Sequence, residues 1–172
     1  MKGAVEGAVG VRRIPEPFCA LSSLPALAYV DRYTLNTEAA ASPEQWARAM
    51  FGDVPSRGER FIWRGLLGLR LSRGRSAGTV AGWRIAERGD DWIRLEATSW
   101  FLAGNLVIQS SGGQVSLGTF LHYRRRLGGA IWPPLSAVHR RLAPGALRDA
   151  EARVLAPPRT ERDGTAGAID PT

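Results

Sequence analysis

Two histidines are the side chains in this sequence best suited to moving a proton, because imidazole gains and loses one near neutral pH. His122 lies in the alternating stretch 114–125, and His139 follows Leu135 by about one helical turn. Either ring could act as a general acid or base on a substrate within hydrogen-bond reach. The simpler alternative is structural, with His122 exposed to water and His139 held by a backbone carbonyl or a carboxylate.

Other common chemistries lack the residues that they need. Cys19 is the only cysteine, so neither an internal disulfide nor a pair of thiolate ligands can form. Lys2 is the only lysine among 23 basic residues, which argues against Schiff-base and P-loop chemistry. The sequence has no nucleophile elbow, and its histidines and scattered carboxylates show no recognised metal spacing. We therefore expect no metal and no cofactor.

Hydroxyl groups for a ligand come from the strand predicted over residues 114–125. Alternation places its more apolar side chains on one face: Val115, Leu117, Thr119, Leu121 and Tyr123. If that face points inward, as we expect, Thr119 and Tyr123 offer their hydroxyls to a ligand, while His122 points to solvent.

The strand predicted over residues 92–100 has two possible orientations. If Ile93 and Leu95 point inward, Arg94 and Glu96 form a solvated pair on the other face, worth little to stability. If the tryptophan face points inward instead, the buried pair marks a polar ligand site. We favour the solvated pair. Several tryptophans could likewise line an aromatic cavity or fill the core, and the core is the default interpretation: Trp83, Trp92, Trp100 and Trp132.

The formal net charge of +7 comes almost entirely from arginine. Arginines in residues 57–75, and the run Arg124 to Arg126, could contact RNA or anionic lipid headgroups. A solvated basic face is the preferred interpretation, since the sequence contains no recognised nucleic-acid motif and such an arginine bias is typical of GC-rich coding sequences.

Local signals predict a strand and then two helices. Residues 27–37 are rich in β-prone side chains. Ser42, Pro43 and Gln45 form the start of a helix, with Ser at the N-cap and Gln at the capping-box position. Residues 57–71 repeat apolar side chains at helical spacing and predict a second, basic helix.

Antiparallel strands and a long helix follow. A hairpin is predicted over residues 82–100 and another over residues 105–125, so that the sheet has about five strands. After Gly128 and Gly129, apolar residues recur at helical spacing to Val154, with a kink or break expected at Pro144.

The chain is predicted to form one domain over residues 26–155, between tails at residues 1–25 and 156–172 that we expect to be disordered. Its hydrophobic runs fall short of the ~20 apolar residues that a membrane-spanning helix needs. The first 25 residues lack the pattern of a secretory signal, so we expect a cytoplasmic protein.

Residues 30–145 resemble the START-like superfamily, also called helix-grip or SRPBCC, and within it a bacterial family described as a domain of unknown function. The order of elements carries the resemblance, together with four motifs: Gly68-Leu69-Arg70, Trp92-Ile-Arg-Leu, Thr119-Phe-Leu-His-Tyr, and Leu127-Gly128 through Pro134 to His139-Arg140. The resemblance implies an α+β fold in which a curved antiparallel sheet wraps a long C-terminal helix and encloses a cavity.

The function expected from this fold is binding of an apolar or aromatic small molecule, such as a lipid or a polyketide-like compound, between the sheet and the last helix. The expected ligand-binding residues are Trp100, Thr119, Tyr123, Trp132 and His139. One alternative is a cyclase or dehydratase-like enzyme, in which His139 or Tyr123 moves a proton and an arginine steadies an enolate. Another is a protein- or RNA-interaction module that uses the basic helix. Nucleic acid is not an expected partner, and a homodimer is left open.

Overall fold

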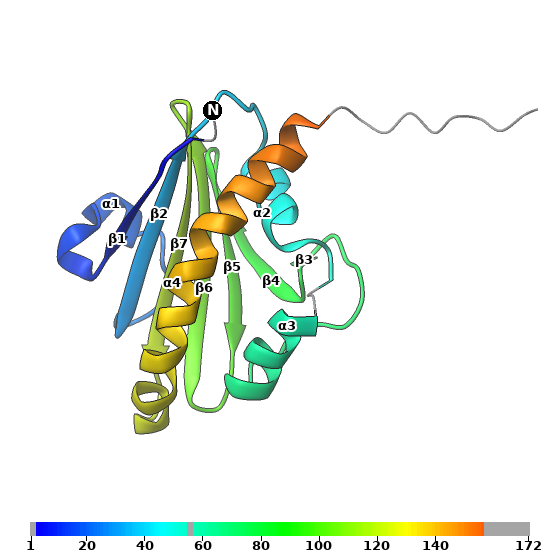
Figure 1. The fold of residues 1–172 in the computed structure, drawn as a ribbon. Coiled ribbons are helices and arrows are strands. Elements are labelled where there is room, and N and C mark those ends of the chain that lie inside the picture. Colours follow the sequence, from blue (N-terminus) through cyan, green and yellow to red (C-terminus); the bar gives the residue numbers. More distant parts are fainter. Residues whose placement is uncertain (1–2, 55–56, 157–172) are drawn as a thin grey trace, which may run out of the picture.

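Seven antiparallel strands form one sheet, which the long helix α4 crosses on one face (Figure 1). The computed structural model describes residues 3–54 and 57–156. The sheet order is β1-β2-β7-β6-β5-β4-β3. The strands are β1 (Val5–Val9), β2 (Tyr29–Asn36), β3 (Thr79–Val80), β4 (Trp83–Arg88), β5 (Trp92–Thr98), β6 (Leu102–Ser111) and β7 (Gln114–Tyr123). The helices are η1 (Val11–Arg13), α1 (Glu16–Cys19), α2 (Pro43–Phe51), α3 (Arg57–Arg60), η2 (Phe61–Leu66) and α4 (Arg126–Leu155).

This arrangement confirms the predicted α+β class and the grip of a curved sheet on a C-terminal helix. Trp132, Ala143 and Leu147 of α4 are buried against the inner face of the sheet. The same face carries Leu117 and Leu121 of β7, so the apolar alternation predicted for residues 114–123 does point inward. No helix in the described part of the chain combines the length and the apolar character that crossing a bilayer requires.

Both predicted hairpins are present, and the sheet has two more strands than expected. β6 and β7 are joined at Gly112 and Gly113, whose φ angles of 60° and 74° suit a two-residue hairpin turn. β1 and β3 were not predicted. β3 has only two residues, and β1 lies in a stretch that shows no strong apolar alternation.

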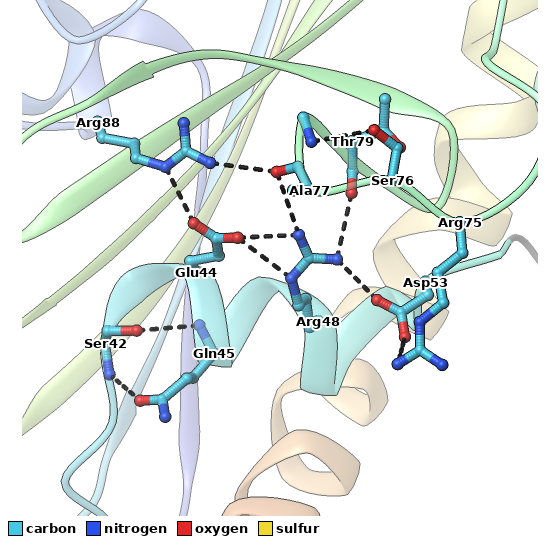
Figure 2. A network of polar contacts seen from close by, with 11 residues as sticks. Ser42, Glu44, Gln45, Arg48, Asp53, Arg75, Ser76, Ala77, Thr79 and Arg88 are labelled. Carbon is cyan, nitrogen blue, oxygen red and sulfur yellow. Dashed lines mark hydrogen bonds and ion pairs between the residues drawn. The ribbon is translucent and has the colours of Figure 1, made fainter.

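The predicted start of α2 is confirmed as a complete capping box. The Ser42 hydroxyl accepts a hydrogen bond from the Gln45 backbone N–H at 3.2 Å, and Gln45 Oε1 accepts one from the Ser42 N–H at 2.8 Å (Figure 2). These two bonds satisfy two backbone donors that the first turn of a helix otherwise leaves unpaired.

An ionic network ties α2 to the far edge of the sheet. Arg48 donates to Glu44 at 2.8 Å, to Asp53 at 2.7 Å and to the Thr79 carbonyl of β3 at 3.2 Å. Glu44 also accepts from Arg88 Nε of β4 at 2.9 Å, as Figure 2 shows. The network fixes α2 beside the short strands β3 and β4.

The second helix is shorter than predicted. It comprises α3 and the π-helical turn η2, and it ends at Leu66 instead of continuing to Leu71. Gly68 has a φ of 60°, a left-handed conformation that a helix cannot continue through. Beyond it Leu69 and Leu71 are buried in the core, which explains why their apolar character resembled a helical pattern.

The predicted disorder of residues 1–25 was wrong for the described part of that segment. β1 pairs with β2, with Val5 opposite Leu35. Ile14 and Phe18 then pack on the outer face of the sheet, where the Phe18 and Phe120 ring centroids lie 5.8 Å apart. The segment is ordered because this face carries apolar residues of its own that need a cover.

The predicted C-terminal helix is present; the alternative of a break at Pro144 was wrong, whereas a kink there stays a prediction. α4 runs from Arg126 to Leu155 without a break at Pro144, which lies inside the helix. Packing of Ala143, Leu147 and Ala150 on the sheet side outweighs the one backbone hydrogen bond that a proline removes. The predicted tail lies outside the described residues, apart from Ala156.

Phe18→Ala should lower the free energy of unfolding by about 3–5 kcal/mol, since it empties a buried ring site on the outer face of the sheet. Urea denaturation followed by tryptophan fluorescence would measure the loss. Val11→Ala is the matched control: Val11 is 50% exposed in the same segment, and its change should stay within about 0.5 kcal/mol. An unchanged stability for Phe18→Ala would show that the segment does not cover the sheet.

Candidate functional site

A cavity of about 150 Å³ lies between the inner face of the sheet and α4. Its walls come from three directions: the sheet, α4, and the α2 and η2 region. The side chains that shape it include Leu106, Leu117, Leu121, Leu135, Ala143 and Trp63. Val138 and Leu142 of α4 also line it and are 45% and 60% exposed, so the cavity reaches the surface beside α4.

The size of this cavity sets the size of what it can hold. A dry apolar cavity of about 150 Å³ suffices to bind one benzene ring. Glu59, Thr119 and His139 are the lining residues with polar side chains, and all the others are apolar or aromatic. The cavity therefore suits an apolar body of about one ring that carries a polar group.

A buried carboxylate stands behind the polar wall of the cavity. Asp31 is the middle residue of the inward-facing series Tyr29, Asp31, Tyr33 on β2, and it is fully buried. Its Oδ2 accepts a hydrogen bond from the Tyr29 hydroxyl at 2.6 Å and lies 2.9 Å from His139 Nε2. Asp31 Oδ1 is also buried and has no hydrogen-bond partner among the described residues.

His139 connects this carboxylate to the cavity. It lines the cavity directly, and its Nε2 lies 3.2 Å from Thr119 Oγ1 as well as within reach of Asp31. Thr119 is the partner of Asp31 in the pairing of β7 with β2, so the two side chains arise next to each other in the sheet. The Trp132 ring centroid lies 5.5 Å from that of His139 and limits its movement.

Two tyrosines beside Asp31 are held in their neutral form. Burial, followed by the Asp31 charge and the hydrogen bond to it, raises the pKa of Tyr29 well above its ordinary range. Burial and the Asp31 charge likewise raise the pKa of Tyr33 to about 12. In both cases a phenolate would be desolvated next to a carboxylate, which explains the direction of the shift.

Three of the five expected site residues line the cavity: Thr119, Trp132 and His139. Their role in binding a ligand stays a prediction. Trp100 does not line it: the side chain is 59% exposed, and its ring packs on Phe101 at 5.2 Å. Tyr123 is half-buried outside the cavity, against Gly128, where a Cβ would come within 2.9 Å of Tyr123 Cδ1.

The outer face of the sheet is not open to solvent as expected, because the N-terminal segment covers it. His122 is only half-buried there, and its Nδ1 lies 3.0 Å from the Ala26 carbonyl oxygen. The structure thus holds His122 by a backbone contact, on the face of the sheet that is remote from the cavity.

Arg94 and Glu96 also point outward, as expected from the buried Ile93 and Leu95, but they are not solvated. Arg94 donates to the Leu21 carbonyl at 2.9 Å, and its side chain is 13% exposed. Burial alone would raise the pKa of Glu96, but hydrogen bonds from Ser23 and Arg94 outweigh burial and lower it. The pair is part of the contact between the sheet and its N-terminal cover.

Part of the basic stretch 57–75 serves the fold. Arg64 donates to the Leu71 carbonyl at 2.6 Å, and Arg75 pairs with Asp53 at 2.6 Å. Arginines engaged in this way are less available to an RNA backbone, and contact with RNA stays an untested alternative.

Asp31 and Tyr29 are the site residues that the sequence analysis missed. The signal was present: Tyr29, Tyr33 and Leu35 alternate on one face of β2, and Asp31 occupies the same face. A carboxylate at an inward position of a strand must have a partner, and the histidines are candidates for that partner.

Comparison with family models, with curated proteins and with solved structures found no match to this chain. What the structure itself defines is a helix-grip fold with an apolar cavity and an Asp-His pair in its wall.

Stability should fall as pH rises from about 10 to about 12, because the pKa of Tyr33 is higher in the folded protein than its ordinary value of 10.0. In that range the unfolded chain has already lost the proton that folded Tyr33 keeps, so alkali favours unfolding. Urea midpoints measured across this range should drop less for Tyr33→Phe than for the wild type. Equal drops would show that Tyr33 does not keep its proton on folding.

Proposed function

We propose that this chain binds an apolar or aromatic small molecule in the cavity between the sheet and α4. The observation that carries the proposal is the cavity itself, which is lined by apolar side chains and has His139 and Thr119 at one wall. Ligand pockets in proteins have this composition: a mostly apolar lining with a few polar groups that fix the orientation of the ligand.

Membership of the START-like superfamily is part of the proposal. It rests on the motifs noted above and is supported by the order of elements and by the grip of the sheet on α4. Fold alone does not determine function, so the proposal rests mainly on the cavity and its lining. A cytoplasmic location remains a prediction from the sequence, which leaves a homodimer open.

An enzymatic function is the second candidate, and one observation favours it. The ring of His139 is held by a carboxylate and lines the cavity, an arrangement that catalytic histidines share. Tyr123, the other residue proposed to move a proton, lies outside the cavity, which leaves His139 for that role in a cyclase or dehydratase-like reaction.

Ala143→Phe should weaken ligand binding, because the added ring would occupy the space between α4 and β7 that the ligand needs. Calorimetric titration with toluene should give the wild type a dissociation constant on the order of 0.1–1 mM, about 4–5.5 kcal/mol. Ala143→Phe should weaken it by more than about tenfold, or ~1.4 kcal/mol.

Ala152→Phe is the control, since Ala152 is an exposed residue on the same helix and does not line the cavity. Thermal unfolding of both variants would first establish that they fold. Native mass spectrometry of freshly purified protein would reveal any retained ligand. If toluene bound neither variant nor the wild type, or bound Ala143→Phe unchanged, the proposal would be wrong.

A further inference from the structure

The contact between Asp31 and His139 fixes which nitrogen of the histidine carries its proton. An ionised carboxylate has only acceptors, so a nitrogen 2.9 Å from Asp31 Oδ2 must carry the hydrogen between them. His139 Nε2 is that nitrogen. In the neutral imidazole the other nitrogen, Nδ1, then holds a lone pair and is the basic atom of the ring.

No residue in the described part of the chain uses that lone pair. Nδ1 of His139 has no hydrogen-bond partner among the described residues, and the ring lines the cavity. The neighbouring hydroxyl is in a similar position. Because the one hydrogen on Nε2 is directed at Asp31 Oδ2, Thr119 Oγ1 at 3.2 Å can only share it as a second acceptor, and the Thr119 O–H proton remains available to another acceptor.

We propose that His139, oriented by Asp31, accepts a proton from a weakly acidic hydroxyl on the ligand, so that the cavity takes a phenol-like molecule. This inference rests on the proposed function. In the step, the ligand O–H bond breaks and its electron pair stays on the oxygen, while an N–H bond forms at Nδ1. Asp31 stabilises the imidazolium through the hydrogen bond at Nε2, and it acts as a positioning residue, not as a group that touches the ligand.

The charges at the site favour a neutral acid over other ligands. A ligand that arrives as an anion would add a second negative charge near Asp31, which is fully buried and pairs through only one oxygen. A neutral phenol brings no net charge, and transfer of its proton to His139 creates a cation next to the Asp31 carboxylate. The apolar walls accommodate the ring, and the Thr119 hydroxyl can donate to the phenolate oxygen.

Two nitroaromatic probes of one-ring size separate binding from proton transfer: nitrobenzene, which has no hydroxyl, and 4-nitrophenol, whose phenolate is yellow and whose neutral form is colourless to the eye. The full chain is titrated with each in a buffer at the pKa of 4-nitrophenol, where about half of the free probe is ionised and an ordinary imidazole is mostly neutral. The other titratable and charged groups around the pair are Tyr29 and Tyr33 of β2, Arg140 of α4, whose charge acts on both tyrosines, and Glu59, which lines the cavity. The raised pKa values of both tyrosines keep them neutral there.

The expected result is that nitrobenzene binds, that 4-nitrophenol binds about tenfold more tightly, and that the bound 4-nitrophenol has the phenolate spectrum. Asp31→Asn keeps the size of the side chain but removes its charge, so it should abolish both the tenfold preference for 4-nitrophenol over nitrobenzene and the yellow colour. His139→Gln should likewise abolish the preference and the colour. A purely structural role for Asp31 would change the affinity for both probes together and leave the spectrum of the bound fraction unchanged.

Equal binding of both probes by the wild type, with 4-nitrophenol remaining neutral, would overturn the proton-transfer proposal and leave the binding function standing. Failure of the wild type to bind either probe would overturn the binding function. If Asp31→Asn does not fold, the spectrum of 4-nitrophenol bound to the wild type and to His139→Gln decides the question.

Discussion

The packing of α4 on the inner face of the sheet is the constraint on which the cavity and its polar wall depend. The buried positions of α4 follow one stripe at helical spacing: Gly128, Trp132, Ser136, Ala143, Leu147 and Ala150. His139 falls in that stripe, between Ser136 and Ala143. A helix held on the sheet at both ends brings this position against β2 and β7, and the residues that meet it there are Asp31 and Thr119.

The electrostatics of Asp31 link this site to the stability of the fold. A lone buried carboxylate costs several kcal/mol, and a partner reduces that cost only where its geometry is good. Tyr29 provides one donor from the same strand. His139 provides the other from α4, so the contact between Asp31 and His139 joins the sheet to the helix across the end of the cavity. The apolar lining cannot substitute for either donor. An interaction that orients His139 for a ligand therefore also holds α4 in place, and the two roles can be separated only by readouts specific to the ligand.

Local sequence signals predicted much of the fold, whereas the parts that depend on long-range contacts could not be predicted from the sequence. The capping box at Ser42 and the turn at Gly112 and Gly113 depend on neighbours in sequence, so the residue types alone were sufficient to predict them. Trp100 was assigned to the site as one of several tryptophans that could line a cavity, whereas β5 ends at Thr98 and the side chain is exposed. Tyr123 was assigned from the alternation of β7, which holds, but as the last residue of that strand it lies beyond the cavity. The order of residues 3–25 depends on an outer sheet face whose need for a cover no local pattern reveals.

The position of the polar groups would also determine selectivity in the proposed complex. A hydrocarbon and its phenol bury nearly the same apolar area, so the leucines and tryptophans of the cavity contribute about equally to both. A hydroxyl that faces those apolar walls would lose its hydrogen bonds to water without replacement, at a cost of roughly 1–3 kcal/mol. A hydroxyl beside His139 and Thr119 would find both an acceptor and a donor. Discrimination therefore arises as much from the penalty on misplaced hydroxyls as from the bond to His139, and it would reject an isomer whose hydroxyl lies elsewhere on the ring.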